Sequence, residues 1–154
     1  MSKTGYVLLA LTLITSLFVL VETAASENAN FTIQPHEERV VTLSLQETDS
    51  VLGSFSVVSN DDTGVDFSAI DPSNQTTIVH SNAKQKSFSF IAEVKGNYQL
   101  RFDNPDFSDY AKTVALNYNV THYIMGLPQE QFLLVVIAIV ALIGVVIYVA
   151  LMPK

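Results

Sequence analysis

Apolar and polar residues alternate in short runs through the middle of the chain, and residues typical of turns close each run. Alternation with a period of two is the pattern of a β-strand with one buried face, because successive side chains point to opposite sides. Such runs occupy residues 39–46, 53–60, 65–70 and 76–81, and their breaks contain NDDTG and DPSNQ. Each run is therefore predicted to be a strand with one face in a core.

From residue 86 onward the apolar residues occupy even positions. The stretch FIAEVKGNYQLRFDN, residues 90–104, reads as a β-hairpin that turns at Gly96-Asn97. A last strand, YAKTVALNYNV, occupies residues 110–120. The residues predicted to point inward in these segments are Phe88, Phe90, Ala92, Val94, Tyr98, Leu100, Phe102, Val114, Leu116, Tyr118 and Val120. Seven to eight strands of this spacing predict a mainly β fold, an antiparallel β-sandwich.

Two long apolar segments flank the alternating region. Residues 6–21 carry no charge and lead to the small residues around Ser26, so residues 1–26 are predicted to be a signal peptide cleaved near Ser26. The alternative is an uncleaved membrane anchor. Residues 132–152 are uncharged throughout and lack a polar face, which predicts a C-terminal transmembrane helix.

The flanking charges predict the orientation of the chain. Lys3 and Lys154 lie on one side of the two apolar segments, and Glu22 and Glu130 lie on the other. By the positive-inside rule the chain is a single-pass type I membrane protein whose sandwich, residues 27–122, is extracellular or lumenal. Residues 123–131 are then a juxtamembrane linker, and residues 153–154 are the cytoplasmic end.

The charge and cysteine content of residues 27–128 limit the kinds of partner that this exported region is expected to bind. Residues 27–128 contain 13 acidic and 6 basic side chains and so hold the whole net charge of −7. An acidic surface disfavours nucleic acid, so no nucleic-acid partner is expected. The chain has no cysteine, so the domain must be stable through its core without disulfides.

The stretch from Val65 to Val120 resembles the second half of a GOLD domain, as found in the p24 (emp24/gp25L) family of secretory-pathway membrane proteins. The similar elements are the Asp71-Pro72 turn, the run FSFIAEVKGNY, the FDN triplet at residues 102–104 and the closing KTVALNYNV. The order of signal peptide, β-sandwich and membrane helix is also similar. The resemblance implies a role in binding cargo or partner proteins.

The chain departs from that family in three ways. The family has a pair of cysteines, and Arg101 occupies the place of one of them. Its coiled coil before the membrane is replaced here by THYIMGLPQEQ, residues 121–131, and Pro153-Lys154 offers no coat-binding signal. The resemblance therefore implies partner binding but not coat recruitment.

The sequence contains no arrangement typical of an enzyme. His36, His80 and His122 are far apart and lack the spacing of metal ligands. Thiol catalysis is impossible without cysteine, and no G-x-S-x-G motif occurs. We therefore expect a non-catalytic protein without a cofactor.

Three groups of residues remain as candidate sites. Acidic loops can bind Ca²⁺, and the better candidate is Asp103, Asp106 and Asp109, ahead of the loop with Asp61, Asp62 and Asp66; acidic residues in turns usually serve only to cap and solvate the loop. The interaction loop is predicted around Asp106, Phe107 and Tyr110. Glycosylation sequons lie at Asn30, Asn74 and Asn119.

The expected function is thus that of an integral membrane protein that presents a β-sandwich to other proteins outside the cytoplasm. The alternative is a small accessory subunit whose helix and sandwich pack on a larger membrane complex. The short linker favours that alternative, because it keeps the domain near the bilayer.

Overall fold

The computed structural model describes residues 26–104 and 109–150, and within the helix it gives no side-chain placement for Val149. The chain divides into two compact units, a sandwich that ends at His122 and a second unit that contains the chain from Tyr123 onward. Each unit is described by itself.

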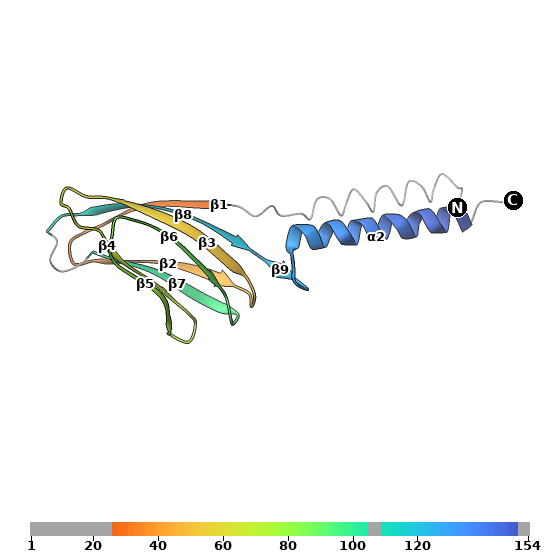
Figure 1. Cartoon of the computed structure of the whole chain (residues 1–154), viewed down its shortest axis with the longest axis horizontal. Helices are drawn as coiled ribbons and strands as arrows, with labels where there is room; N and C mark the ends of the chain where they lie inside the picture. The colour runs from red at the N-terminus through yellow and green to blue at the C-terminus, as the bar shows by residue number, and fades with distance from the viewer. Residues whose placement is uncertain (1–25, 105–108, 151–154) are drawn as a thin grey trace. The chain divides into compact units, whose positions relative to one another are not determined.

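The sandwich consists of two antiparallel four-stranded sheets, which form the two layers in Figure 1. The first sheet has the order β1-β8-β3-β6, and the second has the order β2-β7-β4-β5. The strands are β1 (Ser26–Ile33), β2 (Glu38–Leu45), β3 (Ser50–Val58), β4 (Val65–Ile70), β5 (Thr76–Ala83), β6 (Gln85–Ile91), β7 (Gly96–Asp103) and β8 (Lys112–Thr121). The predicted antiparallel β-sandwich is confirmed.

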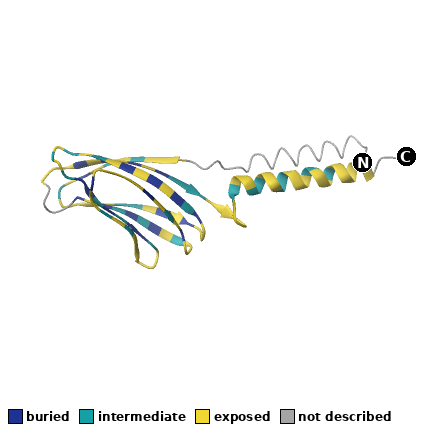
Figure 2. Ribbon diagram, in the orientation of Figure 1, coloured by how far each residue is buried: buried dark blue, intermediate teal, exposed yellow. Residues whose placement is uncertain are grey.

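The core lies between the two sheets and includes most of the side chains that alternation predicts to point inward. Buried and exposed positions alternate along the strands in Figure 2. Phe55 of the first sheet meets Phe67 and Phe102 of the second, with ring centroids 5.0 and 5.3 Å apart. Large rings at these separations bury much apolar area and add favourable edge contacts, which helps a domain without disulfides to stay folded.

The predicted hairpin at residues 90–104 is wrong. Strand β6 pairs with β3 in the first sheet, whereas β7 pairs with β2 and β4 in the second, so the segment between them crosses from sheet to sheet. Ala92 is fixed to the β2–β3 turn by hydrogen bonds with Thr48 and Asp49, each 2.8 Å long. Val94, predicted to point inward, lies in the crossing segment and is 44% exposed. Alternation describes each strand correctly but carries no information about its partner.

Strand connections gather at the two ends of the sandwich. At one end, which we call the loop end, lie the connections that follow Ile33, Val58, Ala83 and Asp103. At the other, the stem end, lie the connections 46–49, 71–75 and 92–95, and the chain leaves the sandwich there through His122. Candidate sites can therefore be assigned to one end or to a sheet face.

The second unit contains a short β-hairpin followed by a helix. The hairpin pairs β9 (Tyr123–Ile124) with β10 (Leu127–Pro128), and the helix α2 spans Gln129–Ala150. Residues Gln129–Tyr148 have a mean hydropathy of 2.9, which makes this helix long and apolar enough to cross a membrane. It begins three residues before the predicted segment 132–152, directly after Pro128, and Glu130 lies in the first turn, where a negative charge is favourable.

Candidate interaction site at the loop end

Two buried polar residues hold the loops of the loop end in place. The first is Asn104, whose exposed fraction is 0%. Its side-chain Nδ2 donates to the carbonyl of Tyr110 at 2.9 Å and to that of Ile33 at 3.4 Å. Its backbone N–H donates to the carbonyl of Glu37 at 3.0 Å. Asn104 therefore links the β7–β8 loop to the β1–β2 connection, which joins the two sheets.

The second is Lys112, the first residue of β8, which is also fully buried. Its Nζ donates to Thr63 Oγ1 at 2.8 Å and to the carbonyl of Gly64. Thr63 in turn donates through its hydroxyl to Asp61 Oδ2 at 2.6 Å. The lysine thus ties the β3–β4 loop, which joins the two sheets, to the start of β8, a central strand of the first sheet.

The environment of Lys112 disfavours its charge. Burial lowers the pKa of Lys112, although the carboxylates of Asp61 and Asp66 act in the opposite direction. A buried ammonium is costly unless its protons are bonded, and here it has two oxygen acceptors. The lysine is therefore a structural clamp, buried beneath the loops.

An acidic row crosses the outer face of the second sheet beside these loops. Asp103 on β7 is in register with Glu38 on β2 and with Asp66 on β4. Arg101 Nη1 lies 3.6 Å from Glu38 Oε2, so the Arg101 side chain also lies on this solvent-facing side of the sheet. Like charges opposite one another in a sheet repel, so this row concentrates negative charge on the outer face.

The predicted interaction loop is only partly described. Tyr110 is half exposed and Asp109 is exposed, whereas Asp106 and Phe107 lie outside the described residues. Among the described residues no group of three or more histidine, aspartate or glutamate side chains could hold a metal ion. The calcium candidate Asp103, Asp106 and Asp109 therefore stays a prediction.

The three sequons divide between a turn and a sheet face. Asn74 lies in the β4–β5 turn with a φ of 65°. Asn30 and Asn119 lie on the neighbouring strands β1 and β8, with both side chains on the outer face of the first sheet. In a strand the Asn and Thr of a sequon point the same way, because they are two residues apart.

That outer face of the first sheet carries no charged side chain over its described strands, and we call it the uncharged face. Its cross-linked polar groups include Asn117, which donates to Asn28 Oδ1 at 2.6 Å and accepts from Ser26 at 3.1 Å. The residues of the uncharged face are Ser26, Asn28, Asn30, Thr32, Ser50, Leu52, Ser54, Ser56, Val58, Gln85, Ser87, Ser89, Ile91, Thr113, Ala115, Asn117, Asn119 and Thr121. In a domain with a net charge of −7 this makes the two sheet faces chemically different.

The three histidines have separate environments. His36 is exposed in the β1–β2 connection, and His80 stacks on Phe67 with 6.2 Å between ring centroids. His122 Nδ1 lies 2.7 Å from Asp49 Oδ2 at the stem end. The three histidines therefore lie in different parts of the sandwich.

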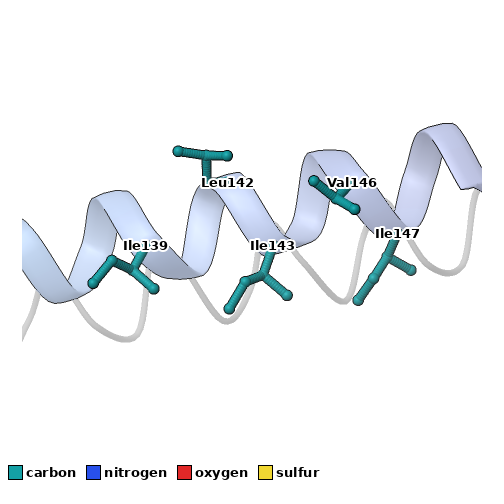
Figure 3. A pocket seen from close by; sticks show the side chains of 5 residues that line it. All are labelled: Ile139, Leu142, Ile143, Val146 and Ile147. Atoms are coloured by element: carbon teal, nitrogen blue, oxygen red, sulfur yellow. The ribbon is translucent and has the colours of Figure 1, made fainter.

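The helix α2 offers a hollow lined only by apolar groups. Figure 3 shows its lining, which consists of Ile139, Leu142, Ile143, Val146 and Ile147. A small-molecule site usually contains a few polar groups that orient the ligand, and this lining contains none. The hollow therefore lacks the polar groups that a small-molecule site uses to orient its ligand.

The three buried polar residues of the described chain, Lys112, Asn104 and Asp49, were not predicted from the sequence. A signal existed for the first two. Lys112 has the same parity as the inward residues Val114 and Leu116, and Asn104 continues the parity of Phe102. No pattern indicated that Asp49, in a turn between two strands, would be buried.

The fold is similar to that of several solved structures at low identity. The periplasmic inhibitor of g-type lysozyme PliG from Aeromonas hydrophila has a TM-score of 0.50 and 11% identity, covering 66% of this chain and 90% of that one. A mutant of the PliG protein from Escherichia coli has a TM-score of 0.46 and 14% identity, covering 66% and 92%. Such similarity concerns the fold alone. No curated protein sequence matches the chain.

A family model places the chain more closely. The model described as emp24/gp25L/p24 family/GOLD matches residues 28–131, which cover the sandwich from the third residue of β1, the β9–β10 hairpin and the start of α2. The matched region thus includes the strands whose motifs suggested this resemblance. The chain belongs to the emp24/gp25L/p24 family and carries its GOLD domain.

Proposed function

We propose that this protein is a non-catalytic, single-pass type I membrane protein whose GOLD domain binds other proteins through its loop end. The observation that carries the proposal is the pair of buried clamps, Asn104 and Lys112, which hold loops from both sheets in one arrangement. A loop set fixed before binding loses less conformational entropy on association, so it suits recognition.

The chemistry of the loop end supports a partner with basic groups and some apolar surface. The acidic row of Glu38, Asp103 and Asp66 supplies negative potential, and the half-exposed ring of Tyr110 supplies a rigid contact. Tyrosine is enriched where protein surfaces bind each other, because its ring is apolar and its hydroxyl is polar. From the charges that flank the apolar segments, we infer that the domain faces the outside of the cell or a lumen.

Site-specific photo-crosslinking tests the proposal in native membranes. A photoreactive amino acid replaces Tyr110 at the loop end, and a matched probe replaces Leu52, which is 63% exposed on the uncharged face. A protein joined to the probe at residue 110 but not at residue 52 is expected. Equal labelling at both positions, or a label at residue 52 alone, would contradict the loop-end proposal.

A second candidate function is that of an accessory subunit of a membrane complex. The uncharged face favours it, because a face without charges can be covered by a partner without burying ions. Crosslinks from residue 52 to one partner, and migration with that partner at constant ratio on a native gel, would support this function.

The sequons provide an independent test between the two functions. A glycan on Asn30 or Asn119 would occupy the uncharged face, so occupancy there is incompatible with a protein interface on that face. If the Asn30→Gln or Asn119→Gln variant migrates faster on a gel than the wild type, that asparagine carries a glycan. This result would exclude the accessory-subunit function. Asn74→Gln, in the turn, is the control that leaves this face unchanged.

A further inference from the structure

The β9–β10 hairpin is a small, exposed and almost entirely apolar element. Its exposed side chains include Met125, which is 89% exposed, and Tyr123, Ile124 and Leu127, each between 36% and 38% exposed. Ile124 pairs with Leu127 and Tyr123 pairs with Pro128, so both faces of the hairpin are apolar. From Thr113 to Gln129 the sequence has no Asp, Glu, Lys or Arg.

The turn at the tip places an apolar side chain where the backbone disfavours one. Met125 has a φ of 53° and Gly126 a φ of 81°, so both central residues lie in the left-handed region. A two-residue turn of this kind favours Asn, Asp or Gly at the first position. Methionine there costs about 1 kcal/mol of backbone energy relative to such residues. The Met125 side chain is nevertheless 89% exposed, so an apolar environment at the tip of the hairpin would be favourable.

A bilayer around the helix that follows would provide that environment. Gln129 continues directly from Pro128, and the hairpin contacts α2 within the same unit. The 20 residues Gln129–Tyr148 are about 30 Å long as a helix, which equals the thickness of the hydrocarbon core. Residues 123–128 then fall within the headgroup layer, which is where tyrosine side chains are enriched.

We propose that the β9–β10 hairpin inserts the side chain of Met125 into the lipid interface and rests on the bilayer through Tyr123, Ile124 and Leu127. This inference depends on the membrane insertion of α2 that belongs to the proposed function. Its consequence is that the chain leaves the membrane through a short folded element that contacts lipid.

Tryptophan fluorescence tests the inference, because the protein contains no tryptophan. The full chain is reconstituted in phosphatidylcholine vesicles that carry bromine atoms near the headgroups or near the ends of the acyl chains. Met125→Trp reports on the hairpin, Leu134→Trp on the helix, and Val58→Trp on the loop end. Val58 is the matched exposed control, because it lies about 26 Å along β3 from the stem end.

The expected result is a loss of Met125→Trp fluorescence that is larger with shallow than with deep bromines, together with a blue-shifted emission. Leu134→Trp should be quenched by both lipids and Val58→Trp by neither. If Leu134→Trp is quenched while Met125→Trp behaves like Val58→Trp, the hairpin inference is wrong and the membrane helix stands. If Leu134→Trp is not quenched, the membrane insertion on which both depend is wrong.

Tryptophan itself prefers the membrane interface, and a spin label provides a second probe without that preference. The chain has no cysteine, so Met125→Cys with a nitroxide label gives a single spin-labelled site. Collision with oxygen should exceed collision with a water-soluble nickel complex, as for a label in lipid. The opposite ratio, at the level of a labelled Val58→Cys control, would overturn the inference.

Discussion

The carboxylate of Asp49 accepts a hydrogen bond from Nδ1 of His122, with 2.7 Å between the two atoms, although 73 residues separate them. Asp49 is 1% exposed, and the same Oδ2 also accepts from the backbone N–H of Gln46 at 2.8 Å. Its Oδ1 has no hydrogen-bond partner among the described residues. His122 is the last residue of the sandwich unit, so this contact fixes the point where the chain leaves the domain.

Loss of that contact should destabilise the sandwich. His122→Ala leaves a buried carboxylate with one partner fewer, and we expect the free energy of unfolding to fall by about 1–3 kcal/mol. Thermal unfolding of the full chain in detergent, followed by near-ultraviolet circular dichroism, measures the loss. A double-mutant cycle with Asp49→Asn isolates the pair, and a coupling energy near zero would show that the contact contributes nothing.

The clamp Lys112 should give the domain a distinct alkaline pH dependence. Its pKa is lowered in the folded protein, so the unfolded chain binds more protons between that lowered value and 10.5. Stability therefore rises with pH in this window. Relative to Lys112→Met, the wild type should gain stability from neutral pH to pH about 10, as measured by urea unfolding. The exposed Lys84→Met is the control, and the same pH dependence in both pairs would contradict the assignment to Lys112.

Tyr118 should act in the opposite direction at higher pH. Burial and the hydrogen bond to Glu27 raise the pKa of Tyr118 from 10.0 to about 12. The folded state retains the proton that the unfolded state loses, so stability falls between pH 10 and pH 12 by about 2–3 kcal/mol. Tyr118→Phe should lose much of this dependence, whereas Tyr98→Phe, which removes a hydroxyl bonded to Val94, should keep it.

Gly53 should not accept a larger residue. A Cβ at this position would lie 2.3 Å from Cζ of Phe88, a core ring on the neighbouring strand. Gly53→Ala must displace that ring, and we expect a loss of about 1–3 kcal/mol in the free energy of unfolding. The adjacent Ser54→Ala, on the exposed face, should change stability by less than about 0.5 kcal/mol. Equal effects of the two substitutions would contradict this packing.

Calcium at millimolar concentration should leave the melting temperature unchanged. Acidic residues in a loop such as β7–β8 normally cap the turn and keep it solvated, and they do this without binding a metal ion. A rise in melting temperature that Asp103→Asn or Asp109→Asn removes would instead show a calcium site in that loop. Magnesium at the same concentration controls for ionic strength.

The sequence by itself determined most of the strands, their buried faces and the apolar helix, although it did not indicate strand β1 or the β9–β10 hairpin. These features depend on short-range patterns, since the period of two identifies Leu100 and Phe102 as inward without knowledge of any partner. The family resemblance also depended on such local motifs, and the family match confirms it.

Only the tertiary structure decided which strands pair, and therefore which loops and side chains lie side by side. Pairing places β6 and β7 in different sheets, gathers the loops around Asn104 and Lys112, and brings His122 to Asp49. These relationships arise because backbone hydrogen bonds and side-chain packing join segments far apart in the chain, and alternation carries no information about the partner strand. The buried polar residues were not predicted for the same reason. A lysine at an inward position is favourable only when oxygen atoms from distant parts of the chain accept hydrogen bonds from its ammonium group.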